Sequence, residues 1–290
     1  MSEFRRRLMS ASRKGSGIDM SNYMTIEALE DGLTAKLTRT ACEYSIDGSE
    51  WVSLAAGTST PAINAGQIIS FKANNPTVNS LYGIGTFTIS KQCNLKGNCM
   101  SMLAYDGADS MTTVKDYGFY KLFQSCTNII NVEKGFLPAT KIGRNSYSQM
   151  FDGCSNLITA PVLSAISVGI YCCSQMFRNC SSLVTPPPEL PALSTGQYCY
   201  SFMFYGCSKI EEAPLLPATK LRDGCYSSMF YGCSNLAYIK MLAPDISASE
   251  CLDSWVNGVA LSGTFVKNKK ATWNVIGTSG VPEGWDVVLE

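Results

Sequence analysis

The sequence contains no histidine among its 290 residues. This excludes histidine-based catalytic triads, the usual general base near neutral pH, and zinc sites that need imidazole ligands. Charged residues make up only 16% of the chain, and 23 Lys and Arg side chains balance 23 Asp and Glu side chains. Since a net charge of zero gives no overall attraction to nucleic acid or to a membrane surface, neither is predicted as a partner.

Long apolar runs are also missing. No stretch reaches the roughly 18 consecutive apolar residues that a membrane-spanning helix needs, so membrane insertion is not predicted. The first 20 residues begin with charged side chains and lack the apolar segment of a signal peptide. We therefore expect a chain that is made in the cytoplasm and carries no export signal.

Motifs for cofactors and metals are weak. Gly83-Ile84-Gly85 does not complete a phosphate-binding glycine loop. No pair of cysteines has the CxxC spacing, and the Asp-Gly pairs are typical of turns rather than of calcium loops. The sequence therefore predicts no catalytic residue, no metal and no cofactor.

Short segments of alternating polarity, separated by turns, follow a basic arm at residues 1–20. Asp47-Gly48 is a strong hairpin signal between two of these segments. Turns at this spacing predict a small β-sandwich-like domain over residues 21–92. The predicted strands are 24–29, 33–38, 42–46, 51–54, 67–72 and 85–90.

A repeat of 25–28 residues occupies the second half of the chain. Its phenylalanines are each followed three residues later by a cysteine. One repeat cannot bury its apolar face alone, so this period predicts a solenoid of about five to six stacked repeats. We assign residues 93–261 to the solenoid with its N-terminal cap and 262–290 to a C-terminal cap. The aligned residues are Phe123, Phe151, Phe177, Phe204 and Phe230, with Cys126, Cys154, Cys180, Cys207 and Cys233, and a degenerate last repeat has Trp255-Val256 in place of Met-Phe.

The chain has 13 cysteines, and four interpretations of the repeated cysteine stay open. The favoured one is a small apolar side chain at a fixed buried position of the solenoid. The others are disulfides between coils, a metal site and a catalytic thiol. An odd count, no CxxC pair and no histidine weigh against these three.

Tyrosines recur at two positions of the repeat. Tyr147, Tyr200 and Tyr226 lie four residues before the phenylalanine, and Tyr205 and Tyr231 lie one residue after it. Exposed aromatic side chains can bind sugar rings or fill a pocket of another protein. We take all five as candidates for a ligand-binding surface, the alternative being that they pack at the edge of the solenoid.

The repeat "MFxGCSxLxxAPxLPATxLxxxC" resembles the BspA-type leucine-rich repeat of surface proteins from gut Bacteroides and their phages. The resemblance is clearest in 203–225 and 229–236. The segments SWVNGVALSGTFVKN and GTSGVPEGW resemble the C-terminal cap of that group, SIDGSEWVSL resembles the domain that often precedes the repeats, and FRRRLM resembles the start of proteins of Bacteroides phages. The resemblance implies a mainly β protein with a leucine-rich-repeat solenoid and a role in adhesion or structure.

We therefore expect a non-enzymatic virion protein of a phage, such as a head or tail fibre or appendage. Its N-terminal region would anchor it to other virion proteins, and its repeats would bind a host surface glycan or protein. A homo-oligomer is expected, with a trimer as one candidate. The alternatives are a cell-surface adhesin of a bacterium and, less favoured, an enzyme acting on polysaccharide. The anchor candidates are Phe4, Arg5, Arg6, Arg7 and Leu8.

Overall fold

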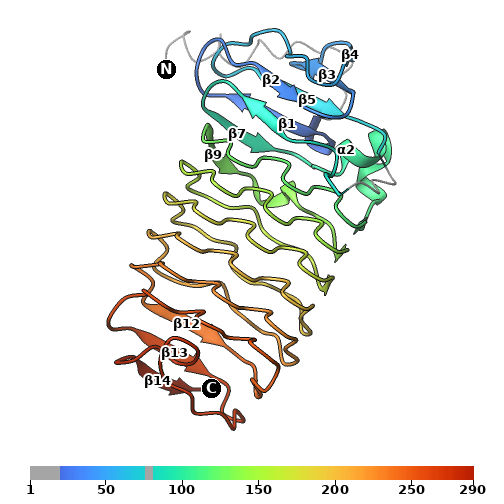
Figure 1. Ribbon diagram of the computed structural model, residues 1–290. Helices are drawn as coiled ribbons and strands as arrows, with labels where there is room; N and C mark the ends of the chain where they lie inside the picture. The colour runs from blue at the N-terminus through green and yellow to red at the C-terminus, as the bar shows by residue number, and fades with distance from the viewer. Residues whose placement is uncertain (1–19, 76–80) are drawn as a thin grey trace, which may run out of the picture.

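The computed structural model describes residues 20–75 and 81–290. The chain is mainly β and forms an elongated stack that ends in a β-solenoid of about seven turns (Figure 1). The first strands lie at one end of the stack and the last strands at the other, so that position along the stack follows position in the sequence. The predictions of a mainly β chain and of a solenoid are confirmed.

The N-terminal segment forms the strands that alternating polarity predicts. They belong to a six-stranded sheet with the order β4-β3-β5-β1-β7-β9 and to a two-stranded sheet of β2 and β6. Asp47 and Gly48 both have positive φ angles, of 51° and 74°, in the turn between β3 and β4, as a tight hairpin requires. The strands are β1 (Met24–Ala28), β2 (Ala35–Leu37), β3 (Cys42–Ile46), β4 (Val52–Leu54), β5 (Ile68–Lys72) and β6 (Phe87–Ile89).

This sheet continues past the boundary predicted at residue 92. β7 (Cys93–Lys96) pairs antiparallel with β1 on one side and parallel with β9 (Ile129–Val132) on the other. The first turn of the solenoid is therefore hydrogen-bonded directly to the N-terminal sheet. The other elements before β12 are η1 (Met20–Asn22), α2 (Ser101–Ala104), η2 (Tyr105–Ser110), β8 (Thr113–Val114), η3 (Lys134–Phe136), β10 (Lys141–Ile142) and β11 (Ser167–Val168).

Backbone hydrogen bonds join each coil to the next at the phenylalanine. The N–H of Phe151 donates to the carbonyl of Met176 at 2.9 Å, and the N–H of Phe177 donates to that of Met203 at 2.9 Å. Amides between these residues bond within the coil instead, as Cys154 N–H does to the Phe151 carbonyl at 3.1 Å. Backbone amides thus alternate between hydrogen bonds within their own coil and hydrogen bonds to the next coil, so both kinds of bond are made along the same segment.

The residue two positions after the phenylalanine adopts a left-handed conformation in every repeat. Glycine is suited to a positive φ angle because it has no Cβ atom, which explains the recurring glycine of the repeat. Where glycine is replaced, the substitutes are a serine and an asparagine. The positions are Ser125, Gly153, Asn179, Gly206, Gly232 and Gly258, with φ angles between 59° and 78°.

The phenylalanine side chains form a continuous column inside the solenoid. Neighbouring rings from Phe123 to Phe230 stack with centroids 5.5–5.7 Å apart and interplanar angles of at most 9°. Phe87 of β6 continues the column at the N-terminal end, 5.6 Å from Phe123. Phe230, Cys233 and Leu236 are fully buried, as expected from the sequence.

The degenerate last repeat ends this column. Trp255 lies 6.0 Å from Phe230, but its ring is tilted by 53°, and it meets Phe265 edge-on at 6.2 Å. Beyond it, a parallel sheet closes this end of the stack (Figure 1). Its strands are β12 (Tyr238–Met241), β13 (Thr264–Lys267) and β14 (Asp286–Leu289).

The substitution Phe177→Ala tests the stacking column. It removes a fully buried ring with neighbours 5.6 Å away on both sides, so we expect a loss of about 3–5 kcal/mol in the free energy of unfolding. The measurement is denaturant unfolding followed by circular dichroism. Phe202→Ala is the matched control in the next repeat, because Phe202 is 36% exposed. An equal loss in both variants would contradict a stabilising role specific to the column.

Candidate functional site

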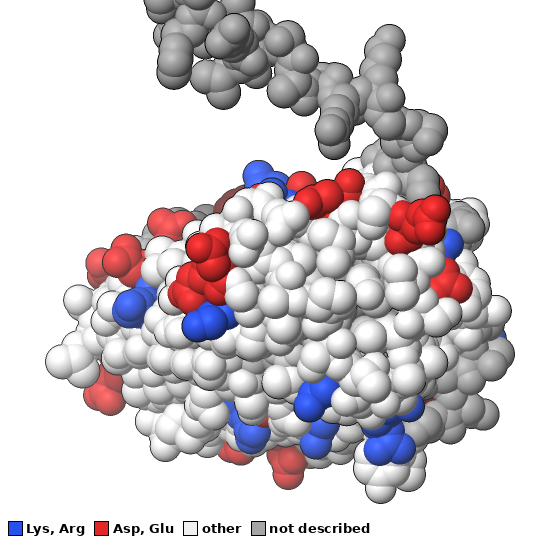
Figure 2. Space-filling view, turned by 90° about the horizontal axis from the view of Figure 1, so that it is seen from above, with Lys and Arg blue, Asp and Glu red and all other residues white. Residues whose placement is uncertain are grey.

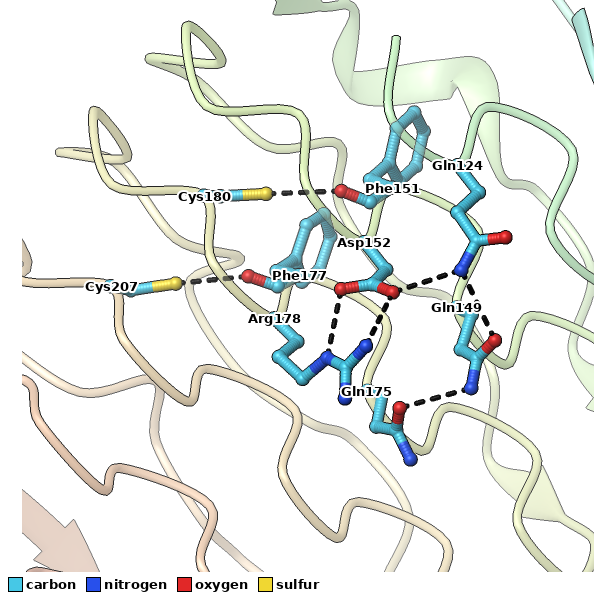
Figure 3. Close-up of polar contacts among 9 residues, drawn as sticks. All are labelled: Gln124, Gln149, Phe151, Asp152, Gln175, Phe177, Arg178, Cys180 and Cys207. Atoms are coloured by element: carbon cyan, nitrogen blue, oxygen red, sulfur yellow. Dashed lines mark hydrogen bonds and ion pairs between the residues drawn. The ribbon is translucent and has the colours of Figure 1, made fainter. Parts of the chain in front are cut away.

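The repeated cysteine holds neighbouring coils together through its thiol. Each Sγ donates a hydrogen bond to the carbonyl oxygen of the phenylalanine in the preceding coil, and two of these bonds are drawn in Figure 3. The same carbonyl also accepts the N–H of the cysteine in its own coil, as Phe151 does from Cys154, so the thiol adds a second hydrogen bond that joins two coils. The bonds are Cys154 to Phe123 and Cys180 to Phe151 at 3.1 Å, Cys207 to Phe177 at 3.0 Å and Cys233 to Phe204 at 3.1 Å.

All 13 cysteines are buried and none forms a disulfide. Burial raises the pKa of Cys126 and of Cys233 to about 12, because an apolar surrounding disfavours the charged thiolate. The thiolate is the form that attacks electrophiles and binds metals. The arrangement therefore agrees with the interpretation of these residues as structural side chains.

A second group of thiols lies where two cysteines adjoin. Cys172 and Cys173 have sulfur atoms 3.9 Å apart, and Cys199 of the next coil lies beside them. Burial raises the pKa of Cys173 and of Cys199 well above the usual range. Within residues 20–75 and 81–290, no group of three or more Cys, Asp or Glu side chains is arranged to hold a metal ion.

The structure corrects three of the five tyrosine candidates. Tyr147, Tyr200 and Tyr226 are at most 2% exposed, so they cannot form a ligand-binding surface. The position four residues before the phenylalanine points into the solenoid, next to the buried cysteines Cys172, Cys199 and Cys225. Burial raises the pKa of all three phenols, and the hydroxyls of Tyr147 and Tyr226 have no hydrogen-bond partner among the described residues.

Tyr205 and Tyr231 lie at the surface, because the position after the phenylalanine points outward. Both are partly exposed, and their rings stack with centroids 4.8 Å apart and an interplanar angle of 10°. Phe202, which is 36% exposed, lies 5.9 Å from Tyr205 with a tilted ring. We call Phe202, Tyr205 and Tyr231 the aromatic surface.

Polar side chains occupy the equivalent positions of the preceding coils. Arg178 donates two hydrogen bonds to the carboxylate of Asp152, from Nε to Oδ1 and from Nη2 to Oδ2, each at 2.9 Å (Figure 3). Gln124 donates to Asp152 at 3.0 Å, and Gln149 donates to Gln175 at 2.9 Å. The pair with Asp152 raises the pKa of Arg178, so the guanidinium stays charged.

These groups can recognise a ligand but are poorly placed for acid–base chemistry. The Asp152 side chain is only 6% exposed and is neutralised by two bonds from Arg178, so it is not a free base. Outward from it lie amides, a guanidinium and tyrosine hydroxyls, which are donors and acceptors for hydrogen bonds. The outer surface of these coils therefore carries side chains that can donate and accept hydrogen bonds.

Sequence reasoning missed most of this surface. Phe202, Asp152 and Arg178 were not among the candidates, although the repeat contains the signal that identifies them. Phe202 lies two residues before a core phenylalanine, and Asp152 and Arg178 each lie one residue after one. Once Tyr205 is known to point outward, the same column identifies Asp152 and Arg178, whereas Phe202 belongs to the column two residues before the phenylalanine. The anchor candidates Phe4, Arg5, Arg6, Arg7 and Leu8 lie outside the described residues.

Comparison with protein-family models, with curated proteins and with solved structures finds no match. None of the helices in the described part of the chain has the length and apolar character needed to cross a membrane. Seen from the N-terminal end, charged side chains are scattered between broad uncharged areas (Figure 2), as the low charged content leads one to expect.

Raising the pH tests the burial of the thiols. In the unfolded chain thiols ionise near pH 8.5, whereas burial raises the pKa of Cys126 and of Cys233 to about 12. The unfolded state therefore loses protons first, and stability that is complete below pH 8.5 falls as the pH rises toward 12. We expect the midpoint of urea unfolding to decrease steadily between pH 8 and pH 10.

The thiol reagent DTNB provides an independent readout. At pH 8 the native chain should react slowly, and all 13 thiols should react after denaturation. Fast reaction of several thiols in the native chain would contradict the buried arrangement.

Proposed function

We propose that this chain is a non-enzymatic structural and adhesion protein of a phage virion, in which the solenoid presents the aromatic surface to a host surface glycan or protein. The observation that carries the proposal is the aromatic surface itself. Phe202, Tyr205 and Tyr231 lie on adjacent coils and remain partly exposed. Tyrosine and arginine are the residue types that dominate binding energy in protein interfaces.

The geometry of the rings decides how they contact a ligand. Because Tyr205 and Tyr231 stack on each other, one face of each ring is already covered within the solenoid. A ligand would meet ring edges and hydroxyl groups, with Phe202 beside them, rather than two open ring faces. Hydroxyl-rich glycans and polar protein loops both offer partners for such a surface.

The rigid stack supports a role in presentation. Each coil is fixed to its neighbours by backbone hydrogen bonds, stacked rings and thiol bonds. Side chains on its surface are held in place before a ligand arrives, which lowers the entropic cost of binding. A homo-oligomer, of which a trimer is one form, would place several copies side by side and raise a weak affinity by multivalency.

The family and the attachment belong to the same proposal. The BspA-type leucine-rich-repeat resemblance agrees with a solenoid that carries surface residues in columns. The N-terminal region, with Phe4, Arg5, Arg6, Arg7 and Leu8 at its start, would attach the chain to other virion proteins. The zero net charge gives neither nucleic acid nor a membrane an electrostatic reason to bind.

The double substitution Tyr205→Ala and Tyr231→Ala tests the binding surface. We expect binding of the purified protein to host cells to fall at least tenfold, since two central aromatic contacts each contribute about 1–2 kcal/mol. The measurement is a cell-binding titration with fluorescently labelled protein, repeated with isolated surface glycans.

Tyr171→Ala with Tyr198→Ala is the matched control, because these two rings form another partly exposed stack at 5.1 Å on the solenoid. Thermal unfolding of each variant shows whether the fold is kept. Unchanged binding of the variant with Tyr205→Ala and Tyr231→Ala to host cells would contradict the proposal that the aromatic surface is the binding site. Absence of the chain from purified phage particles, or its presence on uninfected cells, would contradict the virion role.

A further inference from the structure

The last strand of the stack, β14, has a neighbouring strand along only one of its two edges within the described part of the chain. The sheet order is β12-β13-β14, and β14 pairs in parallel with β13. This sheet lies at the end of the stack opposite the N-terminal sheet (Figure 1). The loop between β13 and β14 packs on the preceding coil instead, where the carbonyl of Gly280 accepts a hydrogen bond from Trp255 Nε1 at 2.8 Å. The second edge of β14 is therefore open.

The backbone of β14 presents four free groups along this edge. The N–H groups of Asp286 and Glu290 donate to the carbonyls of residues 263 and 267, at 2.9 and 3.0 Å, so they face β13. Backbone groups of successive residues point to opposite edges of a strand. The N–H and C=O groups of Val287 and of Leu289 therefore point away from β13. Outside the ladder with β13, no described residue forms a hydrogen bond to these four groups.

Three large apolar side chains are exposed on this strand. Val287, Val288 and Leu289 are 49%, 48% and 61% exposed. Val287 lies in register with Phe265 and Ile239, which are fully buried, so it continues an inward column beyond the last coil that covers it. Edge strands are commonly protected from association by lysine or proline, and β14 contains neither. The open edge therefore combines free backbone groups with exposed apolar surface.

A second copy of the same strand matches this edge. Antiparallel pairing about a two-fold axis at Val288 places Val287 of each copy opposite Leu289 of the other. Residues opposite each other in such a pair exchange N–H to C=O hydrogen bonds, so all four free groups of each copy are used. Val288 then lies beside its own equivalent. Each exposed apolar side chain is thus opposite another apolar side chain.

The charges at the two ends of β14 favour the antiparallel orientation. Asp286 is exposed at the start of the strand. At the other end, Lys240 forms an ion pair with the Glu290 carboxylate, and the N–H of Lys269 donates to the Glu290 carbonyl at 2.8 Å. Lys269 and the adjoining Lys270 are exposed, so this end carries three lysines and one glutamate. Antiparallel pairing brings the acidic start of each strand to the basic end of the other, whereas parallel pairing would bring like charges together.

We propose that the open edge of β14 binds a second copy of this chain, strand to strand, about a two-fold axis at Val288. The pairing joins two three-stranded sheets into one sheet of six strands and covers the apolar side chains at the end of each stack. Because β14 is the last strand of its stack (Figure 1), the two stacks extend away from the shared sheet, with their N-terminal sheets at the far ends. The proposal is independent of the virion role, since it concerns only contacts between copies.

Disulfide crosslinking of the full chain tests the pairing and its register. In Val288→Cys the two introduced thiols lie in a pair with Cα atoms about 4.5 Å apart, within the range of a disulfide. Oxidation with diamide should link most of this variant into dimers on a non-reducing gel, while the 13 native thiols are buried. Val287→Cys is the matched control, because its equivalent lies two residues farther along the second strand, and its yield should be at least tenfold lower. Equal yields, or no dimer with Val288→Cys, would overturn the proposal.

Sedimentation equilibrium measures the association without a crosslink. The mass of the unsubstituted chain should approach twice 31.4 kDa as its concentration rises. Val287→Lys should weaken this association at least tenfold, because a lysine on an edge strand opposes pairing. Ile276→Lys is the control, since Ile276 is 67% exposed in the loop between β13 and β14, and thermal unfolding shows that both variants keep the fold. A monomer at every concentration, a trimer, or equal weakening by the two substitutions would overturn the proposal.

Discussion

The stacking of one coil on the next is the interaction on which the rest of this structure depends. A single coil buries too little apolar surface to be stable alone, so its phenylalanine must lie between two others. Three interactions join adjacent coils at the phenylalanine. They are ring stacking with centroids 5.5–5.7 Å apart, backbone hydrogen bonds, and hydrogen bonds from cysteine thiols to phenylalanine carbonyls. At the two ends, Phe87 and Trp255 replace the missing neighbour.

This constraint also decides which residues are available for function. Most inward positions are apolar, and the thiols of the repeated cysteine donate hydrogen bonds to phenylalanine carbonyls. Burial therefore favours phenylalanine and cysteine at these positions and keeps the thiols protonated. Outward positions are free to vary from coil to coil. The column after the phenylalanine accordingly changes from Gln124, Asp152 and Arg178 to Tyr205 and Tyr231 without altering the fold. The side chains at this surface column can therefore differ from coil to coil.

A change at an outward position leaves the backbone hydrogen bonds between coils unaltered, but a proline in the backbone interrupts them. Pro186 lies in the row of coil-to-coil hydrogen bonds that connects β9 to β12, and it has no N–H group to continue this row. The apolar core continues past this point, because Phe177, Phe204 and Phe230 keep their spacing. A groove lined by residues 159–162, 184–188 and 211–213 can therefore lie on one side of the solenoid while the stack of phenylalanine rings stays intact.

The sequence by itself determined the strands of the N-terminal segment, the period of the solenoid and the inward direction of Phe230, Cys233 and Leu236, because alternation and periodicity are local patterns that reflect burial. Only the tertiary structure decided the direction of the tyrosines. Tyr226 and Tyr231 lie five residues apart in one coil, yet one is buried and the other partly exposed, since the left-handed Ser228 between them changes the side on which the side chains leave the backbone. Likewise, a predicted boundary at residue 92 could not reveal that β7 pairs with β9, because such pairing joins residues distant in the chain.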